Sequence, residues 1–169
     1  MKCLTIAALT AAAPLALAAG SPADSSFYRT LAEGSQSEVD LGKLAEQKST
    51  DPKVKDFAAM MVSDHSAANQ KLVSLAASKN VMLPRTLGDS QQAMRNRLEN
   101  LEGKQFDKSY VQVQLKAHED TVKLLENEIS SGQDADAKAF AQSVLPTIQH
   151  HLEAAQTLAG EEGVKAARR

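Results

Sequence analysis

Four ionisable side chains occupy positions where a helix normally presents apolar residues to a core. In each of four helical stretches, apolar residues recur at steps of three and four, and one member of each series is ionisable. These members are Glu38, His65, His118 and His151. One carboxylate oxygen and three imidazole nitrogens suit Zn, Cu or Fe as ligands. The pattern therefore predicts a single transition-metal ion, bound by these four side chains, as the cofactor.

The four residues are also expected at similar heights in a helical bundle. Glu38, His65 and His118 fall within about one turn of the middle of their predicted helices, and His151 lies about one turn further along its own. Residues near mid-helix meet whichever way the helices are connected. Because a lone buried imidazole or carboxylate is costly, four of them at one level indicate a shared solution.

A hydrogen-bonded network without metal is the alternative solution. Histidine and glutamate side chains can satisfy one another in a bundle core, with or without buried water, and so hold the helices in register. Asp64, Glu119 and Asp120 could orient metal-bound histidines from outside the site, although a solvated helix face is the more frequent role of such residues. His150 lies about 100° from His151 around the helix, so it is expected at the surface.

Helical periodicity runs through most of the chain and is broken at clear points. Asp51 followed by Pro52 predicts a capped helix start, and Asp89 with Gln92 resembles a capping box. Gly132 and Gly160 are expected as left-handed C-caps. The predicted helices, the first of them capped near Asp24, cover residues 24–48, 52–78, 89–103, 104–131 and 134–159.

The order of these helices predicts an all-α fold. Two tight hairpins, around residues 50 and 133, are joined by a long connection that carries the short helix. A long connection between hairpins is typical of a ferritin-like four-helix bundle, whereas a simple up-and-down bundle uses short loops throughout. We expect one bundle domain over residues 20–160, followed by a flexible tail over residues 161–169.

The first 19 residues have the pattern of a signal peptide. A basic start at Lys2 precedes an apolar run that ends in Ala16-Leu17-Ala18, a small-x-small cleavage pattern. The single cysteine, Cys3, would leave with this segment, so the mature chain would hold neither a disulfide nor a thiolate ligand. The expected location is the periplasm or the exterior of the cell.

Composition and motifs argue against several classes of function. The formal net charge is −2 and aromatic residues make up 4% of the chain, so neither the basic surface nor the stacking platform of a nucleic-acid-binding protein is expected. No membrane span is expected after the signal peptide. The chain contains no phosphate-binding glycine loop, Gly-x-Ser-x-Gly elbow or His-Glu-x-x-His motif. Tyr110 is expected to be a core aromatic with its hydroxyl at the end of the bundle.

Three stretches of the sequence carry a resemblance to a known family. They are residues 60–72, which contain Met60-Met61-Val62-Ser63-Asp64-His65, residues 106–118 and residues 145–152; Glu38 followed by Leu41-Gly42 matches the first helix. The chain resembles, over about residues 27–158, the secreted bacterial ferritin-like domains of unknown function 4142, often labelled predicted outer membrane proteins. The resemblance implies a ferritin-like bundle and selects Glu38, His65, His118 and His151 as the family's recurring polar positions. It implies no established activity.

One departure separates this sequence from ferritins themselves. Their di-iron sites use Glu-x-x-His pairs on two helices. In this chain the residues three before the histidines are Val62, Leu115 and Ile148. A single metal ion is therefore expected rather than a di-iron pair.

Three functions follow from these observations. The first is a non-enzymatic module of the cell envelope that binds one transition-metal ion for stability, sequestration or sensing. The second is a mononuclear, redox-active metalloenzyme with a water at an open coordination position. The third is a stress-protective or interaction protein whose inner histidines only hold register. The sequence identifies no protein partner.

Overall fold

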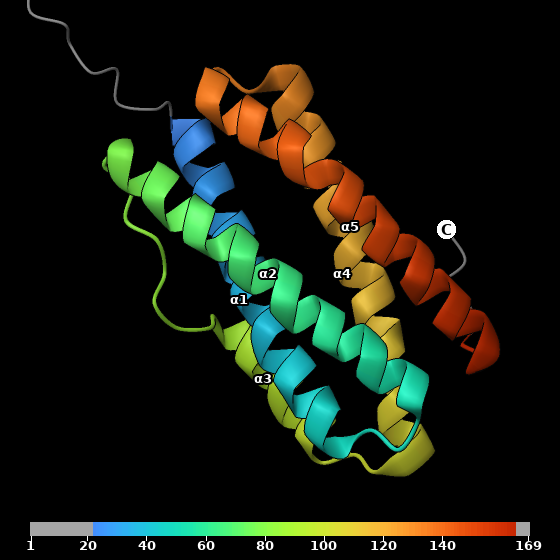
Figure 1. The fold of residues 1–169 in the computed structure, drawn as a ribbon. Coiled ribbons are helices and arrows are strands. Elements are labelled where there is room, and N and C mark those ends of the chain that lie inside the picture. The colour runs from blue at the N-terminus through green and yellow to red at the C-terminus, as the bar shows by residue number, and fades with distance from the viewer. Residues whose placement is uncertain (1–21, 165–169) are drawn as a thin grey trace, which may run out of the picture.

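The computed structural model describes residues 22–164 and contains five α-helices and no strand within that range. The helices form two antiparallel hairpins that pack side by side, with the short helix in the connection between them (Figure 1). This short helix packs against the first and fourth helices. The all-α, ferritin-like topology predicted from the sequence is confirmed. The helices are α1 (Pro22–Lys48), α2 (Pro52–Ser78), α3 (Asp89–Glu99), α4 (Gly103–Ser131) and α5 (Ala135–Glu161).

The apolar core is divided into two clusters. One contains Leu41 of α1 and Met61 of α2, and the other contains Leu31 of α1 and Leu72 of α2. Each cluster includes side chains from all four long helices. On every long helix the predicted site residue lies between a member of one cluster and a member of the other, so the polar residues form a layer between two apolar halves.

Two of the long helices begin with an aspartate cap. The side chain of Asp51 accepts a hydrogen bond from the backbone nitrogen of Lys53 at 2.7 Å, and α2 then starts at Pro52. Asp134 accepts one from the backbone nitrogen of Asp136 at 2.9 Å at the start of α5. These caps satisfy backbone donors that have no partner within the first helical turn. The predicted cap at Asp51 is confirmed.

The starts of α1 and α3 differ from the prediction. Helix α1 begins at Pro22, so Asp24 lies in its first turn, and its carboxylate accepts a hydrogen bond from the backbone nitrogen of Gln133 at 3.0 Å. The predicted capping box of α3 is wrong: Gly88 is its N-cap, without a side-chain hydrogen bond. The predicted end near residue 103 is also wrong, because α3 ends at Glu99.

Of the two glycines predicted as left-handed C-caps, Gly132 does cap α4 but is not left-handed, and Gly160 is not a cap. Gly132 has φ −59° and ψ 151°, an extended conformation that leads directly into the Asp134 cap. Gly160 lies inside α5, which ends at Glu161. A left-handed backbone occurs instead at Asn80, two residues after the end of α2, and at Gly103 and Gly163.

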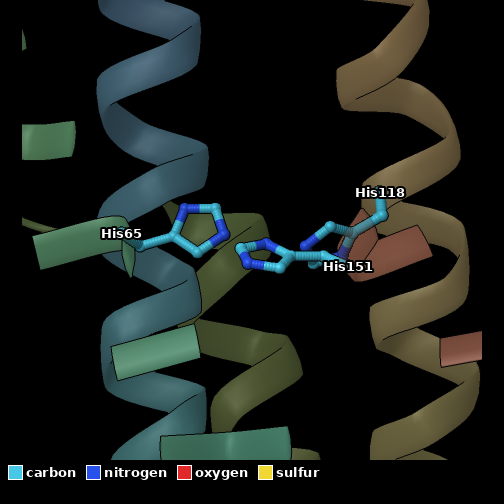
Figure 2. Close-up of side chains that lie close together, drawn as sticks. All are labelled: His65, His118 and His151. Carbon is cyan, nitrogen blue, oxygen red and sulfur yellow. The ribbon is translucent and has the colours of Figure 1, made fainter. Parts of the chain in front are cut away.

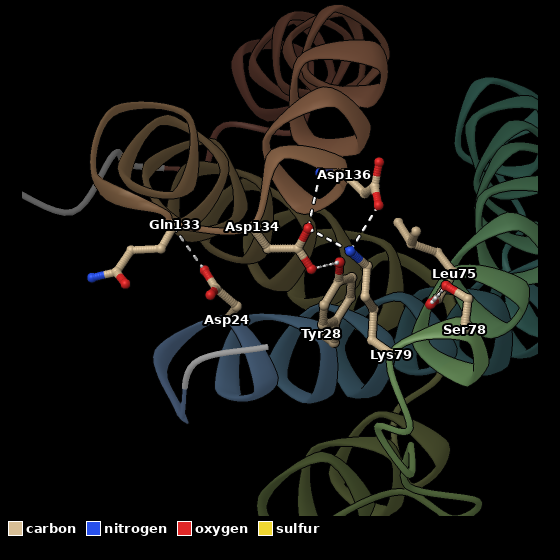
Figure 3. A network of polar contacts seen from close by, with 8 residues as sticks. All are labelled: Asp24, Tyr28, Leu75, Ser78, Lys79, Gln133, Asp134 and Asp136. Atoms are coloured by element: carbon tan, nitrogen blue, oxygen red, sulfur yellow. Dashed lines mark hydrogen bonds and ion pairs between the residues drawn. The ribbon is translucent and has the colours of Figure 1, made fainter. Parts of the chain in front are cut away.

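Side-chain interactions tie the α4–α5 turn to α1 and α2 (Figure 3). The Tyr28 hydroxyl donates to Oδ2 of Asp134 at 3.0 Å. The Lys79 ammonium lies 2.8 Å from Oδ1 of Asp134 and 2.7 Å from Oδ2 of Asp136. Asp134 therefore caps α5 and at the same time joins the two hairpins.

The predicted signal peptide lies outside the described residues, as do residues 165–169 of the predicted tail. None of the described helices combines the length and the apolar character needed to cross a membrane.

Candidate metal centre

Three histidines from three helices meet in the polar layer. His65 of α2, His118 of α4 and His151 of α5 are all buried, and their rings converge (Figure 2). Each ring offers one nitrogen, and these three nitrogens lie within 4.8 Å of one another. The ring centroids are 5.7 Å apart for His65 and His118 and 5.4 Å apart for each of the other two pairs. The structure thus brings together all three histidines singled out in the sequence.

Hydrogen bonds to α1 and α4 orient two of the rings. The carbonyl oxygen of Gln114, one turn earlier on α4, lies 2.9 Å from Nδ1 of His118. Since a carbonyl can only accept, His118 carries its proton on Nδ1. Nδ1 of His65 lies 3.0 Å from the Ser35 hydroxyl, which also lies 3.5 Å from the carbonyl oxygen of His65. The hydroxyl can donate to that carbonyl and accept from Nδ1, so His65 is assigned the same tautomer.

Asp64 orients the third ring. Its Oδ2 lies 3.0 Å from Nε2 of His151, so His151 donates from Nε2 and keeps the lone pair on Nδ1. The remaining ring nitrogens, Nε2 of His65, Nε2 of His118 and Nδ1 of His151, are buried without a hydrogen-bond partner. Each ring therefore has one nitrogen held by the protein and one lone pair left unused. Metal-binding histidines are typically held in this way, through the nitrogen that does not bind the metal.

Burial favours the neutral form of His65 and His151. Burial, together with the neighbouring His118 and His151, lowers the pKa of His65 to about 3. The pKa of His151 is also lowered by burial, although its hydrogen bond to Asp64 opposes the change. Neutral rings at neutral pH leave the unprotonated nitrogens free to bind a cation.

The fourth predicted ligand, Glu38, lies beside the three histidines rather than among them. It is buried in the polar layer on α1, and its Oε2 has no hydrogen-bond partner, but it is not a member of the group of ligand atoms within 4.8 Å. Burial raises the pKa of Glu38, while the neighbouring His118 and the Gln114 side chain act in the opposite direction. The carboxylate is therefore close enough to His118 for the two side chains to influence each other electrostatically.

Other residues near the site behave in different ways. Asp64 does orient a histidine, whereas Asp120 is exposed and pairs with Lys116, one turn earlier on α4. His150 is exposed, as expected. Tyr110 is a core aromatic, as expected, and its hydroxyl is buried without a hydrogen-bond partner.

Sequence reasoning missed Ser35 and Gln114. Ser35 is buried three residues before Glu38, and Gln114 is buried four residues before His118. A spacing of three or four places each on the same helix face as the predicted site residue. A search for any polar residue on the apolar stripes, not only for ionisable ones, would have found both.

Solved structures with this fold include several from other families. A DUF305 protein from Streptomyces coelicolor, described as secreted, has 17% identity and a TM-score of 0.72, over 87% of this chain and 96% of its own. A DUF305 fragment from Deinococcus radiodurans has 12% identity and a TM-score of 0.72, over 85% and 97%. CopM in its Cu(I)-bound form has 14% identity and a TM-score of 0.68, over 82% and 96%. At such identities these likenesses concern the fold alone.

A comparison with curated proteins found no match. A family model matches residues 9–158, which include all five helices up to Leu158 and the whole polar layer. The chain belongs to the family described as domain of unknown function DUF4142.

Proposed function

We propose that this protein is an exported, non-enzymatic module that binds one transition-metal ion through His65, His118 and His151. The observation that carries the proposal is the convergence of three buried rings, each of which offers one nitrogen within 4.8 Å of the others and has one nitrogen without a hydrogen-bond partner. A buried polar atom without a partner costs about 1–3 kcal/mol. A bound ion would supply a partner to all three at once.

The geometry needs little adjustment to accept an ion. Bonds from nitrogen to Zn are about 2.0–2.1 Å, which places ligand nitrogens roughly 3.5 Å apart around a shared ion. The three nitrogens already lie within 4.8 Å of one another. Small rotations of the rings, within their hydrogen bonds to Ser35, Gln114 and Asp64, would close the site.

Copper and zinc fit the donor set better than iron. Neutral imidazole suits both metals, whereas mononuclear non-haem iron commonly takes two histidines and a carboxylate. The copper-bound state of CopM, which shares the fold, makes copper the first metal to test. We assign Glu38 the role of a carboxylate that balances the charge of the ion, because three neutral rings leave that charge uncompensated.

Export is part of the proposal. The predicted signal peptide and the fold shared with a DUF305 protein described as secreted both support it. Mass spectrometry of the protein purified from its natural host tests it, since cleavage after Ala18 or Ala19 gives a defined N-terminus. An intact N-terminal methionine would contradict export by this route.

The metal site is tested by titrating protein purified without chelator or histidine tag with Cu(I), Cu(II), Zn(II) and Fe(II). We expect one equivalent of copper or zinc in the wild type and less than about a tenth of an equivalent in His118→Ala. A ligand that binds only the folded state raises stability by about 2.7 kcal/mol at one hundred times its Kd, so the thermal midpoint should rise as well.

His150→Ala is the matched control, because this exposed histidine is adjacent to His151 in the sequence. It should bind metal like the wild type. Circular dichroism of each metal-free variant separates loss of the site from loss of the fold. Absence of stoichiometric metal in the folded wild type would leave the histidines as a structural network and overturn the proposal.

A further inference from the structure

Two cavities meet at Glu38. The larger, of about 640 Å³, is bordered by all four long helices, and both Glu38 and His65 line it. The second, of about 480 Å³, lies between α1, α3 and α4. Both are lined by Gly34, Glu38, Gln91 and Ala117, so they adjoin one another beside the polar layer.

Small residues keep this region open. Gly34 lies inside α1, one turn before Glu38, and a Cβ built on it would meet no atom within 4 Å. Ala117, which immediately precedes His118, is a second small residue that lines both cavities. Glycine in a helix interior is unfavourable relative to alanine. Its presence here leaves a space that any larger residue would reduce.

The larger cavity is lined by both apolar and polar side chains. Leu31, Leu72 and Phe140 are among the apolar ones. Glu38 also lines it, and the buried Oε2 of this residue lacks a close hydrogen-bond partner. A carboxylate oxygen without a close donor, on a residue that lines a space large enough for a small molecule, points to a ligand that can supply the donor.

The opposite side of the site is less suited to a ligand. A third cavity, of about 250 Å³, is lined by Asp64, His65 and His151. On that side Asp64 occupies Nε2 of His151, and the free nitrogen of this ring is Nδ1. A molecule entering there would meet the hydrogen-bonded nitrogen rather than the lone pairs.

We propose that the metal ion keeps one coordination position on its Glu38 side, and that this position takes a small neutral ligand entering from the larger cavity. Such a ligand supplies a lone pair to the metal and an N–H or O–H to Glu38. Amines, imidazoles and alcohols have this chemistry, whereas small anions would be repelled by the carboxylate. The inference rests on the proposed metal site and adds to it a ligand that comes from outside the protein.

The test compares two probes that differ in one donor. The protein is loaded with Co(II), or with Cu(II) if copper alone is retained, because the visible absorption of both ions changes when a ligand is added. Imidazole has an N–H and 1-methylimidazole has none. We expect imidazole to bind about tenfold more tightly, the effect of one hydrogen bond to a charged group.

Three variants locate the effect. In Glu38→Leu the ratio of the two affinities should fall toward one, because the hydrogen bond is lost; any ratio that remains measures the steric effect of the methyl group. Gly34→Leu should weaken both probes at least about tenfold by filling the cavity. Gly160→Leu is its matched control, because Gly160 also lies in a helix with nothing within 4 Å of a built Cβ but lines none of the three cavities.

Metal content is measured in every sample, so the two proposals can fail separately. A folded wild type that retains no metal overturns both. Stoichiometric metal with no spectral change on adding imidazole overturns only the open position. Equal affinity for the two probes in the wild type, or equal behaviour of the Gly34 and Gly160 variants, would overturn the assigned roles of Glu38 and the cavity.

Discussion

At the residue scale, the site depends on which nitrogen of each ring is left free. The backbone carbonyl of Gln114 accepts a hydrogen bond from Nδ1 of His118, and the ionised carboxylate of Asp64 accepts one from Nε2 of His151. Neither acceptor can donate a hydrogen bond. The two rings therefore present different nitrogens to the same point. This choice is made by the partners of the rings and not by the histidines themselves.

Asp64 should accordingly matter for metal affinity without being a ligand. Asp64→Ala is expected to weaken metal binding about 10- to 100-fold, the usual effect of removing a group that orders a ligand histidine. Competition with a chromophoric chelator measures this affinity. Asp120→Ala is the control, because Asp120 is an exposed carboxylate on α4 that pairs only with Lys116. Equal affinities for the two variants would contradict the role assigned to Asp64.

Gln114 shows the energetic cost of the polar layer. Its side chain is fully buried and neither amide atom has a close hydrogen-bond partner, although the amide lies near enough to the Glu38 carboxylate to lower its pKa; its backbone carbonyl orients His118. Gln114→Leu keeps the carbonyl and removes two unsatisfied atoms, so it should raise the free energy of unfolding of the metal-free protein by about 1 kcal/mol or more. Urea denaturation measures the change. A loss of stability of similar size would indicate a partner for the amide in solution.

At the element scale, the two aspartate caps differ in the other side chains that they bind. Asp51 and Asp134 each accept a hydrogen bond from the backbone two residues later, at the starts of α2 and α5. Only Asp134 also accepts from the Tyr28 hydroxyl and pairs with Lys79, and its pKa is lowered by these partners although burial opposes the shift. The second cap thus connects three helices.

Replacing the two caps should therefore have unequal effects. Asp51→Ala is expected to lower the free energy of unfolding by about 1 kcal/mol, the usual cost of losing an N-cap. Asp134→Ala should cost about 2–4 kcal/mol, because it also leaves a buried tyrosine hydroxyl without its acceptor. Thermal and urea denaturation of both variants gives the comparison. If Asp51→Ala were the more damaging variant, the link between the hairpins would be of little importance.

The sequence predicted the stripes, the heights of the four site residues and the order of the helices, because helical periodicity determines which face of each helix is buried. It did not predict that Glu38 would lie beside the histidines, since a separation of a few ångström depends on side-chain packing between helices. The N-cap at Gly88 and the extended conformation of Gly132 were missed for a related reason. Their backbone angles depend on how the following helix docks, which local residue preferences do not contain.

At the scale of the whole molecule, stability should depend on pH through Glu128. Burial raises the pKa of Glu128 to about 7 from an ordinary value of 4.5, and the Asp24 carboxyl beside it contributes through its charge and a hydrogen bond. Below pH 4.5 the group is protonated in both folded and unfolded chains. Between pH 4.5 and about 7 the unfolded chain loses this proton first, so stability falls as pH rises and then levels off.

Glu128→Gln should remove this pH dependence. The variant is expected to match the wild type in thermal midpoint near pH 4 and to exceed it near pH 8, because its amide cannot ionise. Glu126→Gln, an exposed position on the same helix, is the control and should follow the wild type at both values. A Glu128 variant that is less stable than the wild type at pH 8 would contradict the raised pKa.

The division of the core into two clusters has a consequence for how this fold can change. Each cluster joins all four long helices without help from the layer between them. Apolar packing thus holds the four helices together on both sides of the site. Residues of the polar layer can therefore be substituted while both apolar clusters remain intact. Such an arrangement lets one scaffold acquire, lose or alter a metal site through a few substitutions, so that differences in function among proteins of this shape would be concentrated in a single cross-section.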